Sequence, residues 1–100
     1  KEIKSRIFGT IRTFTLGDYY KYLRNKKTIT QRQFDLLTLL LEFGEEFSLK
    51  NLFEKEKFRV IYRKASERTA RRDLENLHKN NLIALIENSN YVLNYKILES

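Results

Sequence analysis

One hundred residues, 41% hydrophobic and 13% aromatic, are enough for one folded domain with its own core. The lack of cysteine excludes disulfides and thiolate metal sites. No apolar run approaches the roughly 20 residues of a membrane helix, and no secretory signal opens the sequence. We therefore expect a cytoplasmic protein. Because the sequence begins with Lys1 rather than Met, we also expect a piece of a longer protein.

The formal net charge of +7 favours anionic partners, with nucleic acid first and an acidic membrane surface second. This charge lies in two blocks. Residues 1–30 and residues 55–72 each carry eight basic and two acidic side chains, whereas residues 31–54 and 73–100 are net acidic. Solvated surface alone could produce basic runs, but the separation of these two favours surfaces that contact phosphates.

The first part of the chain, residues 1–27, is predicted to be a helical extension. Apolar residues recur there at the three- and four-residue steps of an amphipathic helix, at Ile3, Ile7, Ile11 and Phe14. Gly9 weakens this helix. Residues 15–18 indicate a break, and residues 19–23 predict a short helix that ends in the basic run RNKK.

The second predicted helix begins after Thr30. Thr30 and Gln33 have the spacing of a capping box, in which each side chain bonds the backbone amide of the other residue. Gly44 is the expected end of the helix, because glycine readily adopts the left-handed conformation. The apolar face between them is broad enough for burial on more than one side and consists of Phe34, Leu36, Leu37, Leu39, Leu40, Leu41 and Phe43.

Ser48 is the expected cap of a short helix with Leu49, Leu52 and Phe53 on its apolar face. The following residues, 54–65, leave two readings open. They either extend that helix or form a basic loop.

The longest clear helix begins at Ser66, an expected N-cap, with Glu67 placed well for the helix dipole. Its inward face is Ala70, Leu74 and Leu77, and the pair Asn80-Asn81 can end it. Residues 82–86 and 91–97 then predict a β-hairpin around the turn ENSN, because residues 91–97 alternate between apolar and polar side chains apart from Val92.

Arginines stand on the outward face of this helix. Arginine binds phosphates as a charge and guanine edges as a bidentate fork, so the pattern favours contact with duplex DNA. The candidate DNA-binding residues are Ser66, Arg68, Thr69, Arg71 and Arg72 on the helix, and Lys55, Lys57, Arg59, Arg63 and Lys64 before it. Among the arginines, Arg72 is the one we expect to share a structural role, beside Asp73.

The run ASERTARRDLENLHKNNLI resembles the third helix and first wing strand of winged helix-turn-helix domains. It is similar to the DeoR-type regulators. It is more similar to the C-terminal winged helix of Fic-family proteins, in which an I-T-x-R-Q start accompanies an R-T-A-x-R-D-L helix. Here residues 28–33, TITQRQ, supply the first motif and residues 68–74 the second. The resemblance covers about residues 28–97.

The resemblance implies a mostly α fold with a small β-hairpin, an α+β winged helix-turn-helix with a three-helix core, a wing and the helical extension of residues 1–27. Residues 28–100 would form that domain. Three departures stand out. The connection from Ser48 to Ser66 is longer than the usual tight turn, the wing tip at residues 87–90 has no basic residue, and the Fic signature H-P-F-x-x-G-N-G is absent.

We therefore expect a DNA-binding domain in transcriptional regulation, with residues 66–80 in the major groove. The alternative is a regulatory or protein-interaction module of a Fic-type AMP-transferring enzyme without its catalytic part. We expect no enzymatic activity, cofactor or metal site, since no catalytic set is visible and His78 has no cysteine partners. Residues 55–64 and the basic block of residues 1–30 would hold the DNA backbone. The amphipathic helix of residues 1–14 would alternatively form a homodimer contact, which implies paired half-sites. A membrane-surface role for residues 1–27 is the weakest reading.

Overall fold

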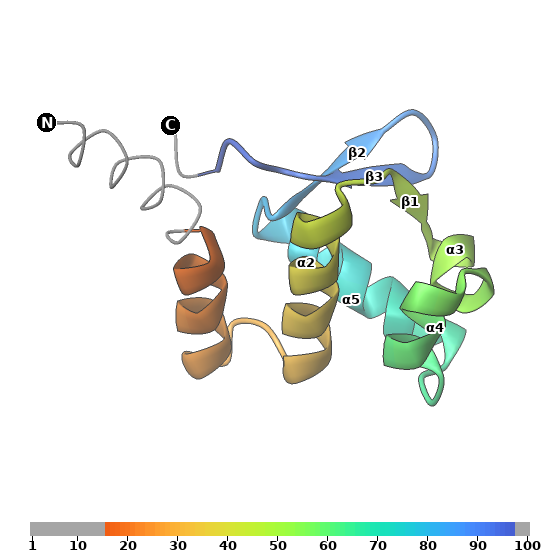
Figure 1. Ribbon diagram of the computed structural model, residues 1–100, viewed down its shortest axis with the longest axis horizontal. Helices are drawn as coiled ribbons and strands as arrows, with labels where there is room; N and C mark the ends of the chain where they lie inside the picture. Colours follow the sequence, from red (N-terminus) through yellow and green to blue (C-terminus); the bar gives the residue numbers. More distant parts are fainter. Residues whose placement is uncertain (1–15, 98–100) are drawn as a thin grey trace, which may run out of the picture.

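The computed structural model describes residues 16–97. The fold is mostly helical with a small three-stranded antiparallel sheet, so it belongs to the α+β class. Figure 1 shows the β2–β3 hairpin crossing one end of the helices. Along the chain, a helix over residues 16–25 is followed by α2 (Gln31–Phe43), β1 (Phe47–Ser48), α3 (Leu49–Glu54), α4 (Glu56–Tyr62), α5 (Glu67–Lys79), β2 (Ile83–Ile86) and β3 (Asn90–Leu93).

The helix over residues 16–25 belongs to the main core. Its Leu16, Tyr20 and Leu23 are buried in the same cluster as the apolar faces of α2 and α5. The predicted break at residues 15–18 is wrong where it can be compared, because residues 16–18 are helical. The amphipathic helix predicted over residues 1–14 lies outside the described residues. Each helix within residues 16–97 is too short or too polar to span a lipid bilayer.

The predicted helix ends are confirmed at α2. Thr30 caps the helix through a complete capping box, in which Gln33 N donates to Thr30 Oγ1 at 3.2 Å and Thr30 N donates to Gln33 Oε1 at 3.1 Å. Gly44 ends it in the left-handed conformation, with φ of 67°, and donates its N–H to the Leu40 carbonyl.

The ends of α5 also follow the prediction. The Ser66 side chain accepts from Thr69 N at 3.1 Å, and Asn81 adopts the left-handed conformation after the helix, with φ of 62°. Inside α5, Ala70, Leu74 and Leu77 are buried as expected.

The region from Ser48 to Ser66 is neither one long helix nor a basic loop. Ser48 caps α3 with a capping box to Asn51, and the chain then bends at Lys55 and starts a separate helix, α4. Only residues 63–66 separate α4 from α5. The long connection seen in the sequence therefore contains two short helices and ends in a four-residue turn.

The sheet contains one strand more than the predicted hairpin. Its order is β1-β3-β2, and β1 pairs with β3 through Phe47 opposite Tyr91. A strand of two residues is too short for an alternating pattern, so the sequence did not reveal it. The last strand is shorter than predicted, since β3 ends at Leu93 and residues 95–97 form a turn.

A buried carboxylate, Asp73 of α5, holds three helices together. It accepts from Arg32 Nε at 2.6 Å and Nη2 at 3.1 Å, and from Gln33 Nε2 at 2.8 Å, both residues of α2. The Tyr62 hydroxyl at the end of α4 donates to it at 2.9 Å. A buried carboxylate is stable only with such donors. These bonds therefore fix α5 against α2 and α4.

The network extends one turn further along α5. Asn76 Nδ2 donates to Gln33 Oε1 at 2.9 Å and to the Thr28 carbonyl at 3.0 Å. Gln33 thus bonds to Thr30, Asp73 and Asn76 at once. The two sequence motifs, TITQRQ and RTARRDL, are joined in space through these side chains.

The Asp73 network gives a test of stability. Asp73→Asn keeps the size of the side chain but replaces the charged acceptor by a neutral amide, whose NH2 group faces other donors. We expect the free energy of unfolding to fall by about 3 kcal/mol. Arg32 keeps about a third of its side chain in water, which limits the loss. Urea denaturation followed by circular dichroism measures it. Glu75→Gln makes the same chemical change at an exposed position of α5 and should shift stability by less than about 0.5 kcal/mol.

The glycines give a second test. A Cβ at Gly44 would lie 3.0 Å from the Tyr95 hydroxyl, on a left-handed backbone, so Gly44→Ala should cost about 1 kcal/mol. Gly17 is helical with nothing within 4 Å of such a Cβ, so Gly17→Ala should stabilise by about 0.5 kcal/mol. Equal effects of the two substitutions on the urea midpoint would contradict this account.

Candidate nucleic-acid interface

The outward face of α5 carries two arginines without intramolecular partners. Arg68 and Arg72 are exposed and four residues apart, so they lie on one side of the helix, away from the buried Ala70 and Leu74. Within residues 16–97, neither guanidinium makes an ion pair, a side-chain hydrogen bond or a ring contact. Both are available to an anion. Arg72 is thus not the structural arginine, because Asp73 beside it bonds to Arg32 instead.

The other predicted contacts on α5 are partly used within the helix. Arg71 Nη2 pairs with Glu67 Oε2 at 2.8 Å, one turn away. The Ser66 hydroxyl accepts from Thr69 N and donates to Thr69 Oγ1, both at 3.1 Å. Both interactions are exposed and therefore weak in water. A phosphate could replace Glu67 as the partner of Arg71, but the residue does not offer a free charge.

The turn before α5 and the end of α4 add three more free cations. Arg59, Arg63 and Lys64 are exposed, and no described residue pairs with them. Val60 stands among them with 67% of its surface exposed. Since only four residues separate α4 from α5, these cations lie close in the chain to the start of the arginine-bearing helix.

Lys55 and Lys57 differ from these cations because each has a carboxylate partner. Both pair with Glu45, Lys57 at 2.7 Å and Lys55 at 3.8 Å. The hydrogen bond from Lys57 lowers the pKa of Glu45 below its ordinary value. Lys57 also lies over the Phe43 ring, at 4.6 Å from its centroid. This pairing ties the start of α4 to the segment after α2, and it leaves less charge for an external anion.

The tip of the β2–β3 hairpin presents no cation. Residues 87–89 are Glu, Asn and Ser, all exposed, and Glu87 adopts a left-handed conformation with φ of 53°. Among the candidate DNA-binding residues, the unpaired positive charge therefore lies on α4, on α5 and on the turn that joins them. Other exposed cations without a partner within residues 16–97 are Lys21, Lys27, Lys79 and Lys96.

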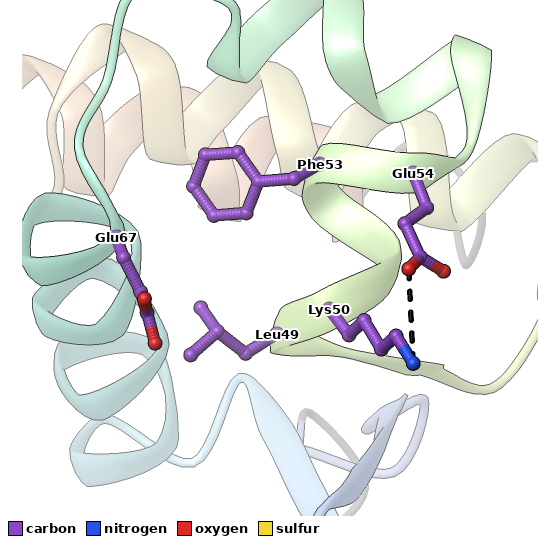
Figure 2. A pocket seen from close by; sticks show the side chains of 5 residues that line it. All are labelled: Leu49, Lys50, Phe53, Glu54 and Glu67. Carbon is purple, nitrogen blue, oxygen red and sulfur yellow. Dashed lines mark ion pairs between the residues drawn. The ribbon is translucent and has the colours of Figure 1, made fainter.

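An open pocket of about 480 Å³ lies between α3 and the start of α5. Figure 2 shows Leu49 and Phe53 of α3 directed toward Glu67 of α5, with the Lys50–Glu54 ion pair at the rim. Two of its three charged groups are carboxylates, and its lysine is paired at 3.7 Å. The side of α5 that faces this pocket is therefore not positively charged.

The residues that sequence reasoning missed are those that position α5. Arg32, Gln33, Tyr62 and Asn76 hold the helix, yet none was assigned a role beyond the Thr30–Gln33 capping box. A signal was present in the sequence, since the TITQRQ and RTARRDL motifs contain Arg32, Gln33 and Asp73 of this network. The hydrogen bond to Asp73 raises the pKa of Arg32 above its ordinary value, so this arginine remains charged.

The described residues contain no group of three or more His, Cys, Asp or Glu side chains that could hold a metal ion. Comparison with models of known protein families, with curated proteins and with solved structures finds no match for the chain.

Removing the hydroxyl group should affect the free energy of unfolding differently at the two buried tyrosines. Tyr62→Phe removes the donor to Asp73, so we expect a loss of about 1.5 kcal/mol at pH 7. The Tyr20 hydroxyl is buried and has no hydrogen-bond partner within residues 16–97. Tyr20→Phe should therefore leave stability unchanged or raise it slightly, as measured by urea denaturation. A larger loss for Tyr20→Phe than for Tyr62→Phe would contradict the network.

The same tyrosines make stability depend on alkaline pH. Burial, the largest cause, raises the pKa of both groups above the usual value, so the folded state retains protons that the unfolded state loses. Their contribution is complete below a pH of about 10 and is lost as pH rises further, by up to about 1.4 kcal/mol per pH unit for each group. Urea denaturation between pH 9 and 11 should give a flatter decline in each Phe variant than in the wild type.

Proposed function

We propose that this chain is a winged helix-turn-helix domain that binds duplex DNA in transcriptional regulation. In this proposal α5 lies in the major groove, with Arg68 and Arg72 toward the DNA, and α4 crosses the backbone. The observation that carries the proposal is the pair of exposed arginines on α5 that no described residue neutralises.

The arrangement of α4 and α5 supports this reading. Two helices joined by a turn of three or four residues are typical of helix-turn-helix motifs, and residues 63–66 form such a turn here. The long connection from Ser48 to Ser66 is therefore compatible with such a motif, because α3 and α4 occupy most of it and the turn itself is short. The β2–β3 hairpin follows α5 directly, and in this proposal it serves as the wing.

The distribution of free charge also supports a phosphate-bearing partner. Arg59, Arg63 and Lys64 precede Arg68 and Arg72, so five unpaired exposed cations lie within residues 59–72, on α4, on α5 and on the turn between them. Cations that already have carboxylate partners, such as Lys57, would lose those bonds on binding a phosphate. We therefore assign the main contacts to the five unpaired cations and secondary contacts to Arg71, Lys55 and Lys57.

The second candidate function is a protein-interaction or regulatory module of a Fic-type AMP-transferring enzyme. The hairpin tip favours it, because it carries no cation and Glu87 would repel a phosphate. The open pocket with Leu49 and Phe53 on its floor is also better suited to a side chain of a protein partner than to DNA. Fold alone does not distinguish the two functions.

Fluorescence anisotropy with a labelled random duplex, measured over a salt series, tests the first proposal. The wild type should bind at about 50 mM salt and weaken steeply as salt rises, because each phosphate contact releases counterions. Arg68→Ala/Arg72→Ala should flatten the slope of log K against log salt by about 1.8, which corresponds to two lost phosphate contacts.

A matched control removes two charges elsewhere. Lys50→Ala/Lys96→Ala lowers the net charge equally, at exposed positions on α3 and after β3, and should retain the wild-type slope. Equal slopes for the two double variants would mean that binding follows net charge rather than the α5 face. No binding at about 50 mM salt would reject DNA as the partner and favour the protein-interaction function.

A further inference from the structure

The exposed side of α5 carries one carboxylate in a row of cations. Arg68, Arg72, Glu75 and Lys79 are all exposed, and their spacing of four, three and four residues places them along one side of the helix. The buried Ala70 lies on the opposite side. A negative charge within this row lowers its attraction to phosphates. Any benefit of Glu75 to DNA binding must therefore come from another kind of contact.

Glu75 has no partner within residues 16–97. Arg72 and Lys79 lie at the spacing of helical ion pairs from it, yet Glu75 forms no ion pair and no side-chain hydrogen bond with them. Glu67 differs, since it pairs with Arg71 at 2.8 Å. Of the two exposed carboxylates on α5, Glu75 is thus the one whose oxygens both remain available to a hydrogen-bond donor.

The chemistry of the major groove limits what such a carboxylate can contact. The phosphates on both sides of the groove are negative and repel it. Among the base edges, guanine presents acceptors, thymine presents an acceptor and a methyl group, and adenine presents a donor beside an acceptor. Cytosine presents its N4 amino donor with no acceptor beside it. Cytosine N4 is therefore the group in the groove that stabilises a carboxylate best.

The length of the row fits one stretch of groove. At 1.5 Å per residue, Arg68 and Glu75 lie about 10 Å apart along the helix axis, within the roughly 12 Å width of the major groove. Lys79 lies about 6 Å further along the axis, where it would reach the phosphates. A helix in the groove can thus hold Arg68, Arg72 and Glu75 over base edges at the same time.

We propose that Glu75 makes α5 selective for cytosine by accepting a hydrogen bond from its N4 amino group. This inference rests on the proposed binding of duplex DNA and adds a base preference to it. Arg68 and Arg72 attract any duplex through its phosphates, and each can also contact a guanine edge. Because Glu75 stands three residues after Arg72 on the same side of the helix, the preferred site has its cytosine close to the guanine that Arg72 contacts.

Selection of bound duplexes from a random library by the full chain, followed by sequencing, tests the role of Glu75. The wild type should enrich duplexes with cytosine at one position. Glu75→Gln should enrich adenine at that position instead, because the glutamine amide both donates to adenine N7 and accepts from N6. Glu75→Ala should show no preference there, since it offers neither a donor nor an acceptor.

Fluorescence anisotropy with the selected duplex gives the size of the effect. Replacing the cytosine and its partner base by an adenine–thymine pair should weaken binding of the wild type about tenfold and strengthen binding of Glu75→Gln. Glu42→Gln removes the same charge from an exposed position of α2 and should keep the preference of the wild type. The salt slope should stay close to that of the wild type in all these variants, because Glu75 contacts no phosphate.

The outcomes separate this proposal from the proposed function. Equal base preferences of the wild type and Glu75→Gln would overturn the role of Glu75 and leave DNA binding in place. The same holds for a wild type that binds duplexes without any base preference, and for a Glu42→Gln variant that changes preference as Glu75→Gln does. No binding of a random duplex at about 50 mM salt would reject the proposed function, and the role of Glu75 with it.

Discussion

The position of α5 depends on one buried carboxylate. Asp73 is 3% exposed and receives four hydrogen bonds from α2 and α4. Removing a charge from water is unfavourable unless strong donors replace the lost hydration, so these elements must meet in one arrangement. Hydrophobic contacts such as those of Leu74 and Leu77 supply most of the burial but tolerate small shifts. Hydrogen bonds are directional, so the bonds to this carboxylate fix the orientation of α5 against α2 and α4. Apolar contacts do not fix an orientation in this way.

The basic residues fall into two groups, those that pair with a carboxylate and those that do not. Arg32 bonds to the buried Asp73, and Lys55 and Lys57 pair with the more exposed Glu45. Of the candidate DNA-binding residues, Arg59, Arg63, Lys64, Arg68 and Arg72 have no partner within residues 16–97, and they lie exposed on α4, on α5 and on the turn between them. Net charge by block could not make this division, because residues 55–72 contain both kinds. Sequence counts therefore locate a basic segment, and packing decides which of its members remain available.

Local signals in the sequence predicted local structure well. The capping residues Thr30, Ser48 and Ser66 and the left-handed ends at Gly44 and Asn81 are confirmed, since each depends on neighbours within a few residues. What failed depends on distant contacts. The strand β1 exists because β3 lies beside it, and the role of Asp73 depends on residues about 40 positions earlier in the chain. The assignment of DNA contacts stays a prediction.

The donors to Asp73 lie at very different distances from it along the sequence, and this difference affects the order of folding. Gln33 and Arg32 precede Asp73 by 40 and 41 residues, whereas Tyr62 precedes it by only 11. The bond to Tyr62 closes a short loop, and the bonds to α2 close a long one at a greater entropic cost. The α4–α5 pair is thus the part that can assemble early. The docking of α2 onto Asp73 completes the domain and makes residues from both halves of the chain unfold as one cooperative unit.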